Sequence, residues 1–213
     1  MTAWLWMEAP GRFSSFKLVV LLALFAPGMW TAGNFVLGLL GPRPLTEAIH
    51  QIRLWAIRFL FVSLAITPLR QILQWPGLLL VRRMVGVAAC AYGFIHLTLY
   101  AIDETLLLLH VASEIVLRIY LTIGFTALVG MALLAATSTD AMVRELGGRR
   151  WRRLHTLVYG IAALAVIHMF MQSKADVQEA TWMTGMLGWL LAYRATAKGF
   201  GRGGRVPQIG RAH

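Results

Sequence analysis

The chain has 213 residues, of which 58% are hydrophobic and 14% are charged, whereas soluble domains average about 45–50% apolar and about 25% charged residues. This composition excludes an intrinsically disordered chain and argues against a soluble domain, whose interior would be too small for so many apolar side chains. The 20 Lys and Arg residues against 9 Asp and Glu give a net charge of +11. The single Cys excludes an internal disulfide or a Cys-based metal site. The basic stretches lack the pattern of a nucleic-acid surface, so we expect a membrane lipid environment and no nucleic-acid partner.

Six apolar stretches are candidates for membrane-spanning helices, each of which needs about 20 mostly apolar residues. The second stretch contains Arg58, which we expect to snorkel to the interface. The last stretch is short but carries Trp182 and Trp189, which are typical of interfacial belts. The predicted spans are 18–38, 53–68, 84–101, 116–136, 154–172 and 180–195.

These spans predict an all-α fold, an integral membrane bundle of six transmembrane helices with both termini cytoplasmic. The connections after the second and fourth spans and the carboxyl-terminal tail are rich in Lys and Arg, which mark the cytoplasmic side. The third connection instead carries Asp103, Glu104 and Glu114. The predicted organisation is a cytoplasmic segment 1–16, a membrane domain 17–196 and a flexible basic cytoplasmic tail 197–213.

The short connections predict that this chain is not a self-sufficient reductase. About 18 residues follow the sixth span, whereas a flavin- and nicotinamide-binding domain needs about 100 residues or more. We therefore expect any electron donor and electron acceptor to be separate molecules.

Three of the six histidines, His96, His155 and His168, lie in predicted spans. An ionisable side chain in hydrocarbon is costly, so each is a candidate functional residue, although a single one is as often a hydrogen-bonded interhelical histidine. We expect His50 and His110 to lie in solvated loops on the outer side.

His96 and His168 have the geometry of an axial ligand pair. They follow Arg83 and Arg153 by 13 and 15 residues, on two spans that run in the same direction. At 1.5 Å per residue, both lie roughly 20 Å from the cytoplasmic edge. A zinc or copper site would need further ligands at that depth, and none is visible. Two imidazoles alone favour one bis-histidine haem, and without a Cys-x-x-Cys-His motif this haem is b-type.

His155 leaves several interpretations open. A second bis-histidine haem would need a histidine near position 82 or 83, where the sequence has Arg82 and Arg83. Thirteen residues separate His155 from His168, about 140° around an ideal helix. Either the helix is distorted, or His155 faces a haem with another ligand, a quinone or a flavin. Arg82 and Arg83 pair with haem propionates or serve only as positive-inside charges.

Three segments resemble those of the MsrQ family, formerly called YedZ, and occur in the same order along the chain: GFIHLTLY at 93–100, RIYLTIG at 118–124 and RRLHTLVY at 152–159. The resemblance implies a ferric-reductase-like membrane fold in the bacterial inner membrane, with haem ligands among His96, His155 and His168. It also implies electron transfer from the quinone pool, or from a cytosolic flavin reductase, to a periplasmic molybdopterin-containing subunit. That partner reduces methionine sulfoxide in oxidised periplasmic proteins. By the resemblance alone, FMN is a further cofactor.

The alternative from a different functional class is a small transporter, or a proton-relay protein that uses its intramembrane histidines. Such transporters often show internal repeats and helices broken near the midplane, and the sequence shows neither.

Overall fold

The computed structural model describes residues 7–9, 12–13, 15–104, 107–172 and 177–203, and almost all of these are helical. Two short antiparallel strands, β1 (Met7–Ala9) and β2 (Arg12–Phe13), precede the helices. The helices are α1 (Ser15–Val36), α2 (Pro44–Leu73), α3 (Leu78–Asp103), α4 (Leu108–Leu117), α5 (Ile119–Ala136), α6 (Asp140–Leu154), the 3₁₀ turn η1 (His155–Leu157), α7 (Val158–Gln172) and α8 (Val177–Gly203).

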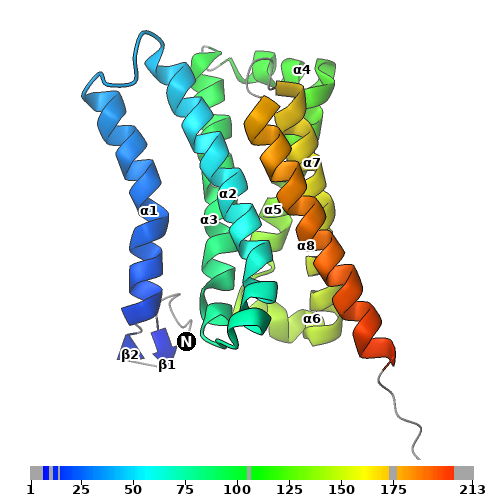
Figure 1. Cartoon of the computed structure of the whole chain (residues 1–213). Helices are drawn as coiled ribbons and strands as arrows, with labels where there is room; N and C mark the ends of the chain where they lie inside the picture. Colours follow the sequence, from blue (N-terminus) through cyan, green and yellow to red (C-terminus); the bar gives the residue numbers. More distant parts are fainter. Residues whose placement is uncertain (1–6, 10–11, 14, 105–106, 173–176, 204–213) are drawn as a thin grey trace, which may run out of the picture.

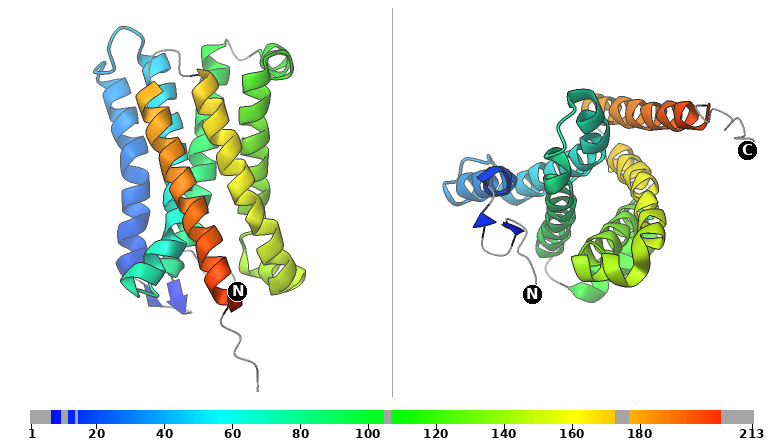
Figure 2. Two further views of the ribbon diagram at one scale, coloured as in Figure 1. Left: turned by 45° about the vertical axis from the view of Figure 1, so that its right-hand side comes forward. Right: turned by 90° about the horizontal axis from the view of Figure 1, so that it is seen from below.

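The long helices α1, α2, α3, α5, α7 and α8 run side by side, while α4 and α6 lie at opposite ends of the bundle (Figures 1 and 2). The strands, α6 and the end of α8 lie at the same end (Figure 1). The all-α membrane fold is therefore confirmed. Which end faces the cytoplasm remains a prediction.

Five helical stretches in the described part are long and apolar enough to cross a membrane: α1, α2, α3, α5 and the stretch Asp140–Gln172 that ends in α7. They coincide with the first five predicted spans. The sixth predicted span lies within α8, which is not among the five but packs against α2 and α7. A six-span count therefore stays a prediction. Helix α8 also continues to Gly203, beyond the predicted start of the tail, whose last ten residues lie outside the described part.

Local sequence signals explain where the helices begin and end. Pro44 is the first residue of α2, a position where its missing N–H costs nothing. The helix ends at Gln74, which has a left-handed conformation with φ of 50°. At α6, the Thr139 Oγ1 accepts a hydrogen bond of 3.3 Å from the Met142 N–H, which caps the start of this helix.

Helix α2 is the centre of the fold, because it contacts α1, α3, α7 and α8. Its Phe61 is 1% exposed, as is Met169 of α7. In contrast, α1 presents large apolar side chains outward, among them Leu22 and Trp30. An apolar outer surface of this kind matches a lipid environment rather than water.

Helix α3 packs chiefly on α2, and α7 packs chiefly on α5. The two pairs meet through contacts of α3 with α5 and of α2 with α7. The cavities described next lie between these pairs.

Candidate functional site

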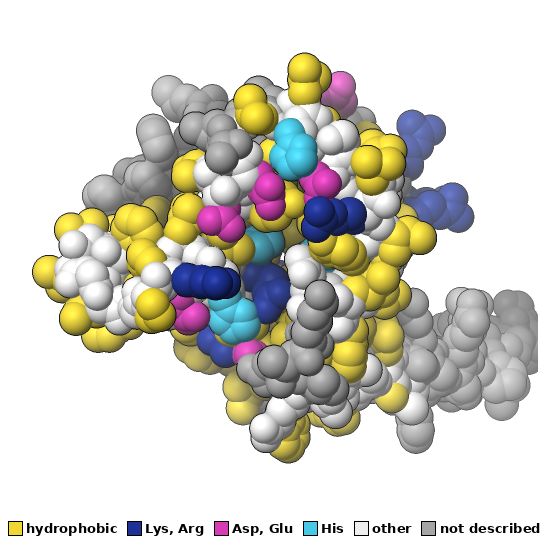
Figure 3. All heavy atoms as spheres, turned by 90° about the horizontal axis from the view of Figure 1, so that it is seen from above, with side chains coloured by type: hydrophobic (Ala, Val, Ile, Leu, Met, Phe, Trp, Pro, Cys, Tyr) yellow, Lys and Arg dark blue, Asp and Glu magenta, His cyan; other side chains and the backbone are white. Residues whose placement is uncertain are grey.

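A cavity of about 360 Å³ is lined mainly by α2, α3, α5 and α7, and we call it the histidine cavity. His96 from α3 and His168 from α7 both line it. Seen from above, the end of the bundle is hollowed at its centre, with histidine and arginine side chains inside and acidic side chains around it (Figure 3). The structure therefore brings together the two residues that the sequence predicts as a ligand pair.

Both imidazoles are oriented by backbone carbonyls. The Nδ1 of His96 lies 3.2 Å from the carbonyl oxygen of Ile49, and the Nδ1 of His168 lies 2.7 Å from that of Tyr120. A carbonyl oxygen only accepts hydrogen bonds, so each Nδ1 carries the proton and each Nε2 keeps its lone pair. This is the tautomer that a metal-binding histidine needs, held by the contact that fixes its ring.

Glycines make room for one ring and for the cavity itself. A Cβ at Gly124 would lie 2.7 Å from the ring atoms of His168, so a side chain there is incompatible with the observed ring position. Gly93 also lines the cavity, and a Cβ there would lie 2.9 Å from Leu128.

Sequence reasoning missed two residues of the histidine cavity, His50 and Arg53. The prediction of a solvated loop for His50 is wrong, because α2 begins at Pro44 and carries both side chains into the cavity lining. An Arg53 Nη2 lies 2.8 Å from the Nδ1 of His50. The available signal was helical spacing: positions 46, 50, 53 and 57 all line the cavity and recur at intervals of three or four.

A second cavity of about 230 Å³, which we call the arginine cavity, lies nearer the end formed by α6. Arg82 and Arg83 of α3 line it together with His155 and Trp151. The His155 ring stacks on Trp151 with 4.0 Å between centroids, and its Nε2 lies 3.3 Å from the Thr137 Oγ1. Arg83 forms an ion pair of 2.6 Å with Asp140.

A break in the helix lies between His155 and His168. The 3₁₀ turn His155–Leu157 separates α6 from α7, so the 140° offset of an ideal helix does not apply. His155 lines the arginine cavity and His168 the histidine cavity. Met131 of α5 lines both, which makes the two cavities neighbours.

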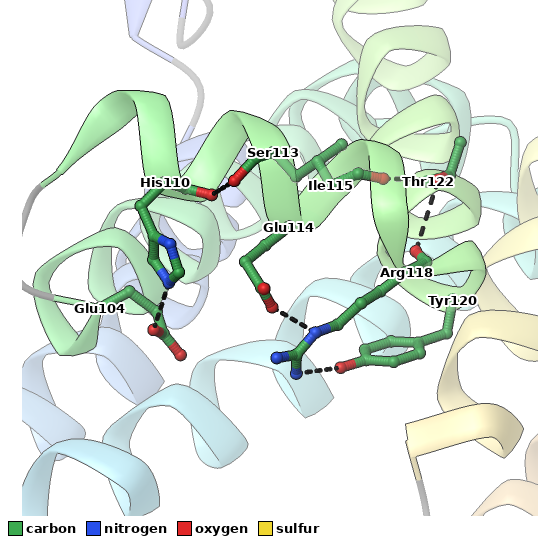
Figure 4. A network of polar contacts seen from close by, with 8 residues as sticks. All are labelled: Glu104, His110, Ser113, Glu114, Ile115, Arg118, Tyr120 and Thr122. Atoms are coloured by element: carbon green, nitrogen blue, oxygen red, sulfur yellow. Dashed lines mark hydrogen bonds and ion pairs between the residues drawn. The ribbon is translucent and has the colours of Figure 1, made fainter.

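A polar network runs from α4 into the start of α5 (Figure 4). It includes Ile115, which lines the histidine cavity, and α4 lies at the opposite end of the bundle from α6 (Figure 1). The carboxylate of Glu104 pairs with the His110 Nε2 at 3.5 Å. His110 is exposed and lies outside the cavity, as expected, but it belongs to helix α4, so the predicted loop position is wrong. Arg118 pairs with Glu114 and donates a hydrogen bond of 3.1 Å to the Tyr120 hydroxyl. The contacts to Tyr120 and Glu114 raise the pKa of Arg118 above its ordinary value.

Within the described ranges, no three His, Cys, Asp or Glu side chains gather into a group that could hold a metal ion. Three imidazoles line the histidine cavity, those of His50, His96 and His168, and they do not gather into such a group. His96 and His168, whose rings contact backbone carbonyls, are therefore the candidate ligand pair. A flat metal complex that brings its own equatorial ligands matches such a pair.

Comparison with known proteins identifies the family to which the chain belongs. Residues 49–166 match the family described as "ferric reductase like transmembrane component". The chain is 40% identical over 193 residues to the protein-methionine-sulfoxide reductase heme-binding subunit MsrQ of Rhodospirillum rubrum, covering 90% of this chain and 93% of that protein. It is 40% identical to the protein of the same name from Xanthomonas campestris, over 81% of this chain and 79% of that protein. The match to the Azospira oryzae protein is 34%, over 89% and 84%. The chain belongs to the MsrQ family, within the ferric-reductase-like membrane proteins.

Proposed function

We propose that this chain binds haem b between His96 and His168 and is the membrane electron-transfer subunit of a methionine-sulfoxide reductase. The observation that carries the proposal is that two imidazoles from different helices line one cavity, each with its Nδ1 directed at a backbone carbonyl. Helix bundles hold haem between facing helices in this way. The names of the relatives, which describe a heme-binding subunit, support this cofactor.

When bound, the haem supplies an iron that takes up and releases one electron at a time. The chain's own residues set its surroundings. The carbonyls of Ile49 and Tyr120 hold the two imidazoles, apolar side chains such as Leu128 limit water, and Arg53 adds a positive charge to the lining.

The arginine cavity is the electron-entry site in this proposal. Arg82 and Arg83 suit an anionic cofactor, a requirement that haem propionates and the FMN phosphate both meet. His155→Ala should slow reduction of the haem in the histidine cavity by the donor while leaving its content unchanged. Stopped-flow absorbance measures this, and wild-type kinetics would make His155 a structural residue only.

In the proposed orientation the arginine cavity faces the cytoplasm and the histidine cavity faces the periplasm, in the bacterial inner membrane. The donor is quinol or a cytosolic flavin reductase, and the acceptor is a periplasmic molybdopterin-containing catalytic subunit. Redox partners commonly meet through small, short-lived interfaces whose on-rates depend on charge. Oxidation of the reduced haem by that subunit should therefore slow as salt rises. No oxidation at any salt concentration would reject the partner.

The test of the ligand pair is the visible spectrum of the purified protein. His96→Ala and His168→Ala should each remove the haem or convert it from low-spin to high-spin. His110→Ala is the matched control, because His110 is exposed and lies outside the cavity. Wild-type spectra and haem content in both variants would reject the assignment.

A further inference from the structure

A third cavity, of about 230 Å³, lies between α2, α7 and α8, and we call it the side cavity. Its lining combines apolar and polar side chains: Leu64, Thr67, Pro68 and Gln71 from α2, Tyr159 from α7, and Leu190, Tyr193 and Arg194 from α8. The residues of α2 lie at positions i, i+3, i+4 and i+7, and those of α8 at i, i+3 and i+4, so each helix contributes one continuous face. None of these residues belongs to the two cavities described above.

Some polar groups of the side cavity form hydrogen bonds with one another. The Tyr193 hydroxyl donates to the Gln71 Oε1 at 2.9 Å. The Arg194 guanidinium donates to the Tyr159 hydroxyl and lies 4.6 Å from the centroid of that ring. The Thr67 Oγ1, in contrast, is buried and has no hydrogen-bond partner among the described residues. A buried hydroxyl without a partner needs an explanation, and a ligand oxygen would supply one.

Pro68 adds a hydrogen-bond acceptor to the same place. Proline has no N–H, so the carbonyl of Leu64, one turn earlier, lacks its helical donor. Both residues line the side cavity. Within a membrane, a backbone group of this kind must find another partner. The cavity therefore offers the Thr67 hydroxyl and the Arg194 guanidinium as donors, and the Leu64 carbonyl as an acceptor.

This combination selects a class of ligand. Among the lining residues the only charged side chain is Arg194, and no carboxylate is present, so a cation has no counterpart. A phosphate is poorly matched by one guanidinium that already contacts a tyrosine. A neutral, flat ring whose oxygens accept hydrogen bonds when it is oxidised and donate them when it is reduced can pair with the Thr67 hydroxyl, the Arg194 guanidinium and the Leu64 carbonyl. Leu64, Pro68 and Leu190 provide the apolar part.

The side cavity adjoins the arginine cavity. On α2, Leu60 and Ser63 line the arginine cavity, whereas Leu64 and Thr67 line the side cavity. On α7, the adjacent residues Val158 and Tyr159 divide in the same way. The linings of the two cavities are thus one helical turn apart on α2 and adjacent in sequence on α7.

We propose that the side cavity binds the ring of a membrane quinol, with Thr67 and Arg194 contacting its oxygens. The inference rests on the proposed electron-transfer function and gives its donor a binding site. Oxidation of the quinol to the quinone releases two electrons and two protons. The electrons leave one at a time toward the arginine cavity, and the protons pass to water. Reduction of one sulfoxide to a thioether and water by the partner subunit consumes two electrons and two protons, so the exchange balances.

The experiment uses the full-length, haem-loaded protein in phosphatidylcholine nanodiscs without added quinone. Binding of a photoreactive azido-quinone is measured by equilibrium titration, and the labelled peptides are identified. Thr67→Val and Arg194→Met should each weaken binding about tenfold, the effect of losing one good hydrogen bond. Label should be found in α2 and α8 of the wild type.

Matched controls separate the site from general effects. In Thr184→Val the lost hydroxyl bonds only the Ala180 carbonyl within α8, and in Arg70→Met the lost charge is exposed on α2. Both should bind like the wild type. An unchanged haem spectrum after dithionite reduction shows that a variant is folded.

Wild-type affinity in both Thr67→Val and Arg194→Met would overturn the proposal, as would labelling confined to other helices. Displacement of the probe by phosphatidylglycerol but not by unlabelled quinone would instead make this a lipid headgroup site. A haem-loaded protein that binds no quinone rejects only this inference. A wild-type protein without haem rejects the proposed function itself.

Discussion

The absence of a side chain at Gly124 determines where the His168 ring can lie, because a Cβ there would be 2.7 Å from it. We expect Gly124→Ala to displace the imidazole and to reduce low-spin haem several-fold in the absorption spectrum. Gly160→Ala is the matched control on α7, since nothing lies within 4 Å of its Cβ. In a helix this control change adds about 0.5–1 kcal/mol of stability. Identical low-spin haem content in the two variants would contradict the steric argument.

Arg53 contributes a positive charge to the lining of the histidine cavity. A positive charge favours the reduced iron, because reduction lowers the net charge of the haem. Arg53→Gln should therefore lower the haem midpoint potential, by about 60 mV if the one-electron equilibrium changes tenfold. Spectroelectrochemical titration measures the potential. Arg70→Gln, exposed on the same helix, is the control. A potential equal to that of the wild type would remove Arg53 from the haem environment.

For individual residues, the sequence predicted the ligand pair but not the side chains around it. His96 and His168 could be paired because depth along a helix follows from residue count. Arg53 and His50 were missed because the predicted second span began at residue 53, whereas α2 begins at Pro44. A charged residue at the start of an apolar stretch is indistinguishable in sequence from a loop residue.

Among the described side chains, an ion pair of 2.6 Å between Arg58 and Glu179 joins α8 to α2. Arg58 was expected to snorkel to the interface, and instead it pairs across helices. Arg58→Met and Glu179→Gln should each lower the free energy of unfolding by about 2 kcal/mol. The double variant should lose less than the sum, because both changes remove the same contact. Thermal unfolding monitored through haem absorbance measures this, with Arg70→Met as control. Fully additive losses would show that the pair contributes nothing.

Helix boundaries were the least predictable feature of the elements. The predicted fifth span, 154–172, merges η1 with α7, because the 3₁₀ turn at His155 has no distinctive composition. The bend at Gly147, with φ of 72°, likewise depends on a residue that occurs in straight helices too. The start of α2 at Pro44 was likewise missed, because the predicted second span began at residue 53.

For the whole molecule, the orientation and the sixth span can be tested together. In a Cys90→Ala background, which has no other cysteine, single cysteines replace the exposed residues Arg144, Gln178 and Thr196. A membrane-impermeant maleimide should reach positions 144 and 196 only from the cytoplasm and position 178 only from the periplasm. Labelling of 178 and 196 from the same side would mean that α8 does not cross the membrane.

The global arrangement was predictable in outline, because apolar stretches define spans and basic connections favour one orientation. Which helices face one another was not. The sequence suggested that the helices of His96 and His168 are neighbours, but α3 packs mainly on α2 and α7 mainly on α5. The histidine cavity exists because the α2–α3 pair and the α5–α7 pair contact each other over only part of their length. Contacts between helices that are distant in the chain produce no periodic pattern in a single sequence.

Met131 belongs to the lining of both the histidine cavity and the arginine cavity. The partition between two chambers thus includes one unbranched, readily rearranged thioether side chain. When the Met131 side chain changes rotamer, the volume that it leaves in one cavity is matched by volume that it occupies in the other. A change in the conformation of the Met131 side chain would therefore alter the space available in both cavities. A β-branched residue at position 131 has a restricted χ1 angle, so it would hold the shape of each cavity constant, whereas Met131 allows both shapes to change together.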